Sequence, residues 1–298
     1  MRLLAKKYIV FITLAIHWAA PATADPLYPA LANAGDPVLQ RDLEQTIDGF
    51  GLASAARNSA LSVALVDITE PQEPRVATVN GDHMMYAASL PKIAILLGAF
   101  KQIENGEMAL DADTRDELTR MIRFSSNQAA TTMLNRVGKQ YLADLLQSPE
   151  YLLYDRDNNG GLWVGKEYGK QPAWKRDPLH NLSHGATAFQ VARFYYLLET
   201  GQLLPDELTR EMKAMLGQPG IDHKFVRGLN ESRPGSNIFR KSGSWRQWHA
   251  DSAIVEREGR RYIAVALAQS SEGGQWLERL IVGLDNLVFG RVRVASLN

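Results

Sequence analysis

Two residues in the stretch 88–92, which reads Ala-Ser-Leu-Pro-Lys, have the types and spacing of an activated nucleophile. Ser89 precedes Lys92 by three positions, and residues with this spacing are neighbours on one helix face. The residues after Lys92 are almost all apolar, which predicts a buried helix that ends near Glu104. Burial lowers the pKa of a lysine, so a neutral amine could take the proton of Ser89 near neutral pH. Pro91 suits a first helical turn and places Ser89 at the helix N-terminus, where free N–H groups stabilise negative charge.

Two further motifs carry residues suited to the same chemistry. Ser125-x-Asn127 lies where one predicted helix ends and another begins, and Lys241-Ser242-Gly243 lies on a predicted strand. Each motif alone has a structural explanation, since Ser and Asn are common helix caps and a glycine can end an edge strand. A serine three positions before a lysine also arises by chance. All three motifs in this order, however, match the signature of penicillin-binding proteins and class A β-lactamases.

On these motifs the sequence resembles the class A β-lactamase-like serine hydrolases of the penicillin-recognising group. Residues 125–138 and 238–287 also look like that family, and the resemblance covers most of the chain except residues 148–183. It implies a β-lactamase-like fold and acyl transfer through a covalent serine ester. The implied substrate is a small molecule, a β-lactam or a D-alanyl peptide, and no cofactor is implied.

The resemblance also implies a role for each motif residue. Ser89 would attack the amide carbonyl, and Lys92 would help to remove its proton. The N–H groups of Ser89 and Ser244 would form the oxyanion hole, which is often the largest electrostatic contribution to catalysis. Ser125 would pass a proton to the leaving nitrogen. Asn127 would bind the side-chain amide of the substrate and hold Lys92.

The substrate carboxylate would be received at the third motif. Lys241 and Ser242, followed by Gly243, are the implied residues for this binding. Many relatives place an arginine for the carboxylate near the position of Ala250. Arg246 is the candidate that could replace it here.

The sequence departs from the family pattern in two places. The interval between Ser89 and Ser125 is shorter than usual, which predicts that part of one cleft wall is missing and the cleft is wider. The Glu-x-x-Leu-Asn pattern that marks the deacylating glutamate of the β-lactamases is not found. Glu167 and Asp177 lie in the matching loop, and each is either the deacylation base or a solvated or structural carboxylate.

Three functions are compatible with these motifs, and β-lactam hydrolysis is the one we expect first. The second is a D-alanyl peptidase, or a related amidase or esterase that uses the same acyl-serine. The third is a penicillin sensor that becomes acylated without turnover. The three differ in deacylation, which is the step where this sequence is least like a β-lactamase.

Metal-binding patterns in the chain are incomplete. Residues 155–160 begin like a calcium loop, but the twelfth position is Lys166 where a glutamate is needed, so we expect a turn. His180 and His184 are four apart in a predicted loop leading into a helix, without a third ligand. No metal site is therefore predicted. His249, which comes just before a predicted strand, is either near the site or a surface imidazole.

The elements that must position these residues follow from hydrophobic spacing. Helices are expected at 38–50, 111–147, 186–199, 205–216 and 275–287, and strands at 61–68, 75–79, 237–243, 252–256 and 262–269. The expected class is α+β: an antiparallel sheet formed from both chain ends and flanked by helices, with an inserted all-helical part. We expect one domain, 25–298, with the sheet in about 25–85 and 220–298 and the helical part in about 105–205.

Composition and the first residues indicate where the protein acts. The 298 residues contain 33 basic and 33 acidic side chains, which does not favour a nucleic-acid partner or an anionic membrane surface. Residues 1–24 have a basic start, a short apolar run and an Ala-Thr-Ala ending, which indicate a secretory signal peptide, with an uncleaved anchor as the alternative. No later stretch is long and apolar enough to span a membrane. We expect an exported monomer in the periplasm or secreted.

Overall fold

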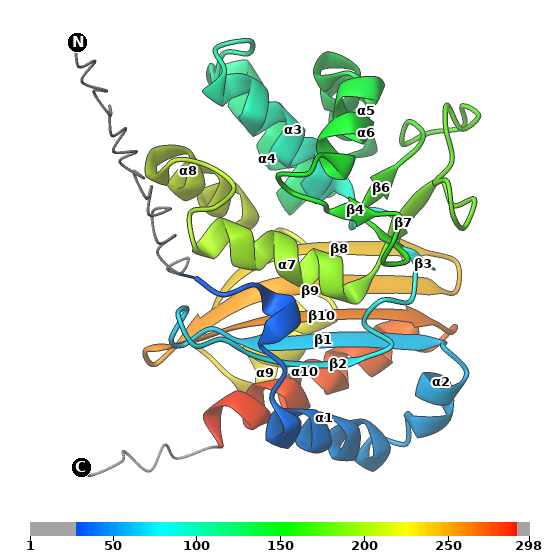
Figure 1. Ribbon diagram of the computed structural model, residues 1–298, viewed down its shortest axis with the longest axis vertical. Helices are drawn as coiled ribbons and strands as arrows, with labels where there is room; N and C mark the ends of the chain where they lie inside the picture. Colours follow the sequence, from blue (N-terminus) through cyan, green and yellow to red (C-terminus); the bar gives the residue numbers. More distant parts are fainter. Residues whose placement is uncertain (1–27, 291–298) are drawn as a thin grey trace, which may run out of the picture.

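A five-stranded antiparallel sheet joins the two ends of the chain (Figure 1). The computed structural model describes residues 28–290. The strands stand in the order β2-β1-β10-β9-β8, and Leu61 at the start of β1 lies opposite Ala268 near the end of β10. Their bounds are β1 Leu61–Asp67, β2 Arg75–Val79, β8 Asn237–Trp245, β9 Trp248–Arg257 and β10 Arg260–Gln269.

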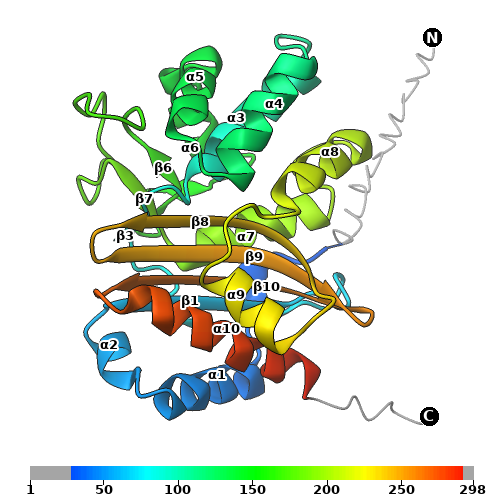
Figure 2. The ribbon, with the colours of Figure 1, turned by 180° about the vertical axis from the view of Figure 1, so that it is seen from behind.

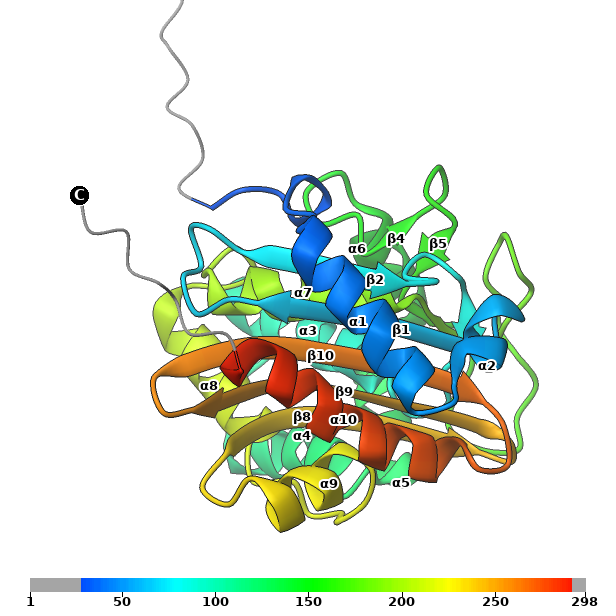
Figure 3. The ribbon, with the colours of Figure 1, turned by 90° about the horizontal axis from the view of Figure 1, so that it is seen from below.

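Helices cover both faces of this sheet, so its central strands are buried on both sides. One face packs against α1 (Pro37–Gly49), α9 (Phe225–Ser232) and α10 (Gly273–Phe289), as Figures 2 and 3 show. The apolar stripe of α1 contributes Leu39 and Leu43 to this core. Because helices cover both faces of the sheet at β1, every residue of this strand is buried.

The opposite face carries α7 and, beyond it, the helical part of the molecule (Figure 1). The remaining helices are α2 Ala53–Arg57, α3 Lys92–Glu104, α4 Ala112–Arg123, α5 Asn127–Val137, α6 Lys139–Gln147, α7 Ala188–Glu199 and α8 Asp206–Leu216, with a 3-10 turn η1 at Leu31–Asn33. The short strands are β3 Met85–Tyr86, β4 Tyr154–Asp155, β5 Gly160–Gly161, β6 Trp163–Val164 and β7 His184–Ala186. Strands β3, β7 and β6 form a small sheet that leads the chain to α3.

The predicted fold class is confirmed: one antiparallel sheet is built from both ends of the chain, with helices inserted between them. The helix expected from Ser89 begins three residues later, at Lys92, and its N-cap is Pro91. The helical region 111–147 is divided into three helices by a Ser126 cap and by Gly138, whose φ is +90°. Helix α9 was not predicted.

The signal peptide predicted at 1–24 lies outside the described residues. Within residues 28–290 no helix has the length and apolar character that a membrane span needs.

Candidate active site

Ser89 lies in the turn between β3 and α3, at the wall of a cavity of about 680 Å³. Its carbonyl accepts a hydrogen bond from Lys92 N at 3.3 Å, which closes the turn before the helix. Within residues 28–290 the Oγ of Ser89 has no hydrogen-bond partner, so the hydroxyl is available to a substrate. The preceding residue, Ala88, has φ +50°, a conformation that is costly for a non-glycine residue and is often found at functional sites.

Lys92 is fully buried, and its ammonium contacts the second motif. Its Nζ donates to Ser125 O at 2.7 Å, to Asn127 Oδ1 at 2.8 Å and, more weakly, to Ser125 Oγ at 3.3 Å. Burial lowers the pKa of Lys92 to about 7. The neutral amine expected from the sequence is therefore accessible near neutral pH. No hydrogen bond joins Lys92 directly to the Ser89 hydroxyl in the part of the chain that the structure describes.

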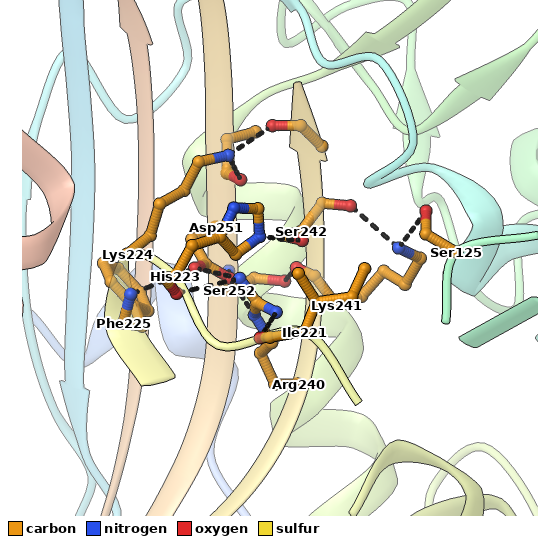
Figure 4. Close-up of polar contacts among 12 residues, drawn as sticks. Ser125, Ile221, His223, Lys224, Phe225, Arg240, Lys241, Ser242, Asp251 and Ser252 are labelled. Carbon is orange, nitrogen blue, oxygen red and sulfur yellow. Dashed lines mark hydrogen bonds and ion pairs between the residues drawn. The ribbon is translucent and has the colours of Figure 1, made fainter. Parts of the chain in front are cut away.

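Ser125 connects the first and third motifs. Its Oγ accepts a hydrogen bond from Lys241 Nζ at 3.0 Å, and Figure 4 shows these two side chains pointing toward each other. Lys241 is buried, and burial lowers its pKa well below the ordinary value, with a further contribution from the nearby charge of Lys92. Ser125 has φ +56°, a second residue with a costly backbone conformation. The structure thus places one hydroxyl within hydrogen-bond distance of two lysines.

Gly243 brings strand β8 against the turn that carries Ser89. A Cβ at Gly243 would collide with Ala87 O and would lie 2.8 Å from the backbone nitrogen of Ser89. Only glycine permits this approach. As a result Ser244, the next residue, lines the same cavity as Ser89, as the oxyanion-hole prediction requires.

Two side chains of the segment before α9 were missed by the sequence analysis. Lys224 is buried, and its Nζ donates to Gly243 O at 2.6 Å, Ser244 Oγ at 2.8 Å and Ala250 O at 3.1 Å. Burial lowers its pKa to about 8. His223 Nε2 lies 3.2 Å from the Oγ of Ser242. Lys224 has φ +52°, so its conformation is held by these contacts rather than by local preference.

Lys224 places a cation beside Ala250, the position near which many relatives have an arginine and for which Arg246 was the sequence candidate. Arg246 lies instead in the exposed turn between β8 and β9, with its guanidinium 5.7 Å from the Trp245 ring centre. Lys224 could not be found from a motif because its partners lie 19 to 26 positions further along the chain, on the neighbouring strands β8 and β9. Ser242 is buried on β8 beside Lys241, at the position predicted for carboxylate binding.

A buried ion pair underlies this part of the site. Arg240 Nε and Nη2 each donate to the carboxylate of Asp251 at 2.7 Å, and Asp251 also accepts from Phe225 N at 3.2 Å (Figure 4). Arg240 Nη1 donates to Ile221 O at 3.2 Å. The Arg240–Asp251 pair therefore attaches the segment 221–225, which contains Lys224, to strands β8 and β9.

Removing Asp251 will destabilise the protein strongly. Asp251→Ala leaves the Arg240 guanidinium buried without its carboxylate, and breaking a buried pair in this way costs about 3–5 kcal/mol of unfolding free energy. Urea denaturation will measure the loss. Glu258→Ala is the control, because Glu258 is exposed and its removal should change the unfolding free energy by less than about 1 kcal/mol. Equal effects of the two variants would contradict the structural role of Asp251.

The two candidate deacylation bases occupy different environments. Glu167 lines the cavity, and its carboxylate accepts from Lys139 Nζ at 2.6 Å, a hydrogen bond that lowers the pKa of Glu167. Asp177 is buried and accepts from Tyr154 Oη at 2.9 Å and from three backbone N–H groups of residues 179–182. The structure therefore gives Asp177 the role of holding a turn in the loop.

Tyr168, the residue after Glu167, covers Lys92 on the cavity side. The Lys92 ammonium lies 4.5 Å from the centre of the Tyr168 ring, a cation–π distance. The Tyr168 ring also lies beside the imidazole of His184, with 4.3 Å between the ring centres. The hydroxyl of Tyr168 is buried and has no hydrogen-bond partner within residues 28–290. This aromatic cover had no counterpart in the sequence analysis.

The incomplete metal patterns have structural explanations. Asp155 accepts hydrogen bonds from Asp157 N and Asn158 Nδ2, which confirms the turn expected there. His184 lies on strand β7, not in a loop, and burial lowers its pKa to about 4. His249 on β9 packs beside Gly273 at the start of α10. In residues 28–290 no group of three or more acidic or imidazole side chains is arranged to hold a metal ion.

The fold and the site together are those of a serine enzyme. The chain belongs to the Beta-lactamase enzyme family (Beta-lactamase2), which it matches over residues 42–115 and 111–285. No curated protein sequence matches this chain.

Solved structures show the same fold at low sequence identity. PBP-A is 18% identical, with a TM-score of 0.64, over 87% of this chain and 98% of its own. A β-lactamase from Sphaerobacter thermophilus is 18% identical with a TM-score of 0.63, and the match covers 84% of this chain and 96% of that one. A β-lactamase from Chitinophaga pinensis is 14% identical with a TM-score of 0.67, and the match covers 84% of this chain and 98% of that one. A mutant of PBP-A is known as an acyl-enzyme complex with penicillin G.

Proposed function

We propose that Ser89 forms a covalent ester with β-lactams and with D-alanyl peptide-like substrates, and that water releases this ester slowly. The observation that carries the proposal is the environment of Lys92. Its amine contacts Ser125 and Asn127, while its cavity side is covered by the ring of Tyr168 rather than by a carboxylate.

The acylation step uses a short chain of hydrogen bonds in which Ser125 Oγ contacts both Lys92 and Lys241. Ser89 Oγ attacks the amide carbonyl carbon, and its proton passes to the neutral amine of Lys92. The N–H groups of Ser89 and Ser244 stabilise the oxyanion. Ser125 Oγ, between Lys92 and Lys241, gives a proton to the leaving nitrogen as the C–N bond breaks, and is reprotonated by Lys92.

Substrate binding places a carboxylate at the end of strand β8. Ser242 and Lys241 are the residues proposed to receive it, and Lys224 adds a third polar group through its contact with Ser244 Oγ. Asn127 Oδ1 accepts from Lys92, so its amide nitrogen is available to the substrate's side-chain carbonyl.

The positions of Glu167 and Tyr168 support the proposal of slow deacylation. These adjacent residues extend in different directions: Glu167 reaches Lys139 at the start of α6, and Tyr168 reaches Lys92. A water beside the ester therefore meets an aromatic ring where a general base would be needed. General-base assistance contributes about 10²–10⁴ to such a step.

Rapid β-lactam hydrolysis is the second candidate, and the place of Glu167 favours it. This carboxylate lines the cavity that Ser89 lines, and its lowered pKa keeps it ionised at neutral pH. It would have to leave Lys139 to activate a water. A penicillin sensor would be the extreme case, in which the Ser89 ester is not hydrolysed at all.

The lifetime of the adduct tests the proposal. We expect intact-protein mass spectrometry to show one benzylpenicillin adduct that persists for minutes or longer after excess ligand is removed. With a chromogenic cephalosporin, we expect a burst equal to the enzyme concentration and then a slow phase. Fast turnover without a detectable adduct would contradict slow release.

The variant Glu167→Gln separates the two candidates. If Tyr168 covers the site and Glu167 stays on Lys139, the ester lifetime in Glu167→Gln will equal that of the unmodified protein. A much longer lifetime in the variant would identify Glu167 as the deacylation base and favour a β-lactamase. The sequence pattern of residues 1–24 supports the further proposal that the enzyme acts after export, and we propose that it acts as a monomer.

A further inference from the structure

The catalytic cavity has an aromatic lining beyond the residues that carry out acyl transfer. Rings and apolar side chains enclose much of it, and they come from four segments of the chain. They are Tyr86, Tyr168, Leu182, Trp245 and Trp248. Tyr86 and Trp248 meet edge to face with ring centres 6.1 Å apart, so these two rings of the wall support each other. Such a lining suits an apolar or aromatic substituent on the acyl side of the substrate.

The loop after β6 adds two positive charges to this wall. Lys166 and Lys170 line the cavity, and within residues 28–290 neither ammonium has a hydrogen-bond or ion-pair partner. The acidic residue between them in the loop, Glu167, is neutralised by Lys139. His184 beneath them is uncharged, since burial lowers its pKa to about 4. The loop side of the cavity therefore has an uncompensated positive charge.

These charges lie on a different wall from the one that takes the first carboxylate. Strand β8 supplies Lys241 and Ser242, whereas Lys166 and Lys170 belong to the loop between β6 and β7. Asn127, which contacts the side-chain amide in the proposed function, lines the same cavity as this loop. A substituent next to that amide would come near the two lysines.

We infer that the site selects dianionic substrates, with one carboxylate at strand β8 and a second carboxylate beside an apolar or aromatic group on the acyl side. This inference rests on the proposed function and adds its substrate class. Exposed charge pairs contribute up to about 1 kcal/mol each, which corresponds to about fivefold in rate per lysine. Both lysines together should give a preference of up to about 25-fold.

Three penicillins that differ at one carbon test this preference. The probes are benzylpenicillin and its derivatives with a carboxylate or an ammonium group on the carbon between the ring and the amide. The second-order acylation rate, followed by intact-protein mass spectrometry, should be highest for the carboxylate and lowest for the ammonium derivative. The differences should diminish between 20 and 300 mM salt because exposed charges are screened.

Matched variants assign the effect to the two lysines. The double variant Lys166→Gln/Lys170→Gln should lose the charge preference while keeping its rate with benzylpenicillin. Lys175→Gln, in the same loop with its ammonium near the Trp174 ring, should keep the preference. Equal rates for the three penicillins, or a preference that persists in the double variant, would overturn the inference and leave the proposed function intact. Failure of all three penicillins to acylate Ser89 would overturn both.

Discussion

The Ser89→Ala variant will form no covalent adduct with benzylpenicillin and will lose all turnover of a chromogenic cephalosporin. The Ser89 hydroxyl faces the cavity without a partner in the described part of the chain, so alanine removes the nucleophile and little else. For the same reason the unfolding free energy should change by less than about 0.5 kcal/mol. Intact-protein mass spectrometry and urea denaturation measure the two quantities.

A second serine in the same cavity provides the control for this variant. Ser183 also lines the cavity, with its Oγ 3.4 Å from His184 Nδ1, and lies outside the three motifs. Ser183→Ala should be acylated at nearly the rate of the unmodified protein. An adduct in Ser89→Ala, located by peptide mapping at another residue, would show that the nucleophile has been misassigned.

The Lys92→Met variant will be acylated about 10²–10⁴-fold more slowly, which is the usual contribution of a general base. Methionine fills a similar buried volume but cannot accept the proton of Ser89. Lys101→Met, on the same helix, is the control, because the Lys101 ammonium pairs with Glu104 and not with the motif residues. A rate in Lys92→Met close to that of the control would exclude Lys92 as the base.

The acylation rate of the unmodified protein should rise with pH. Below about pH 7 the Lys92 side chain is an ammonium and cannot take a proton, whereas above it the neutral amine predominates, because burial lowers the pKa to about 7. The rate with benzylpenicillin should therefore reach half of its maximum near pH 7. A rate that is constant between pH 5 and pH 8 would not fit proton transfer to Lys92.

Much of the fold could be predicted because its elements have simple hydrophobic patterns. Helix α1 has one apolar stripe, and the strands at both ends of the chain are apolar and bounded by turn residues. The start of α3 was predicted three residues early because Ser89 and Leu90 have no feature that excludes a helix. In the structure these residues form a turn, next to Ala88 with its φ of +50°.

The motif residues were predictable as a set, while the groups around them were not. Ser89, Ser125 and Lys241 belong to short patterns that keep their order in the family. Lys224 reaches the site only because the Arg240–Asp251 pair and helix α9 place it there, and neither leaves a local pattern in the sequence. Tyr168 is one of several aromatic residues in an irregular loop, so its contact with Lys92 depends on the path of that loop.

The contact between Gly243 and the turn that carries Ser89 would allow a labelled penicillin to follow the folding of the protein. These residues are far apart along the chain, and a single methylene group at Gly243 would force them apart. Fluorescent penicillin should therefore mark only molecules in which the two ends of the chain have already joined into one sheet. Refolding from urea, sampled with short pulses of such a reagent, would report when that closure takes place.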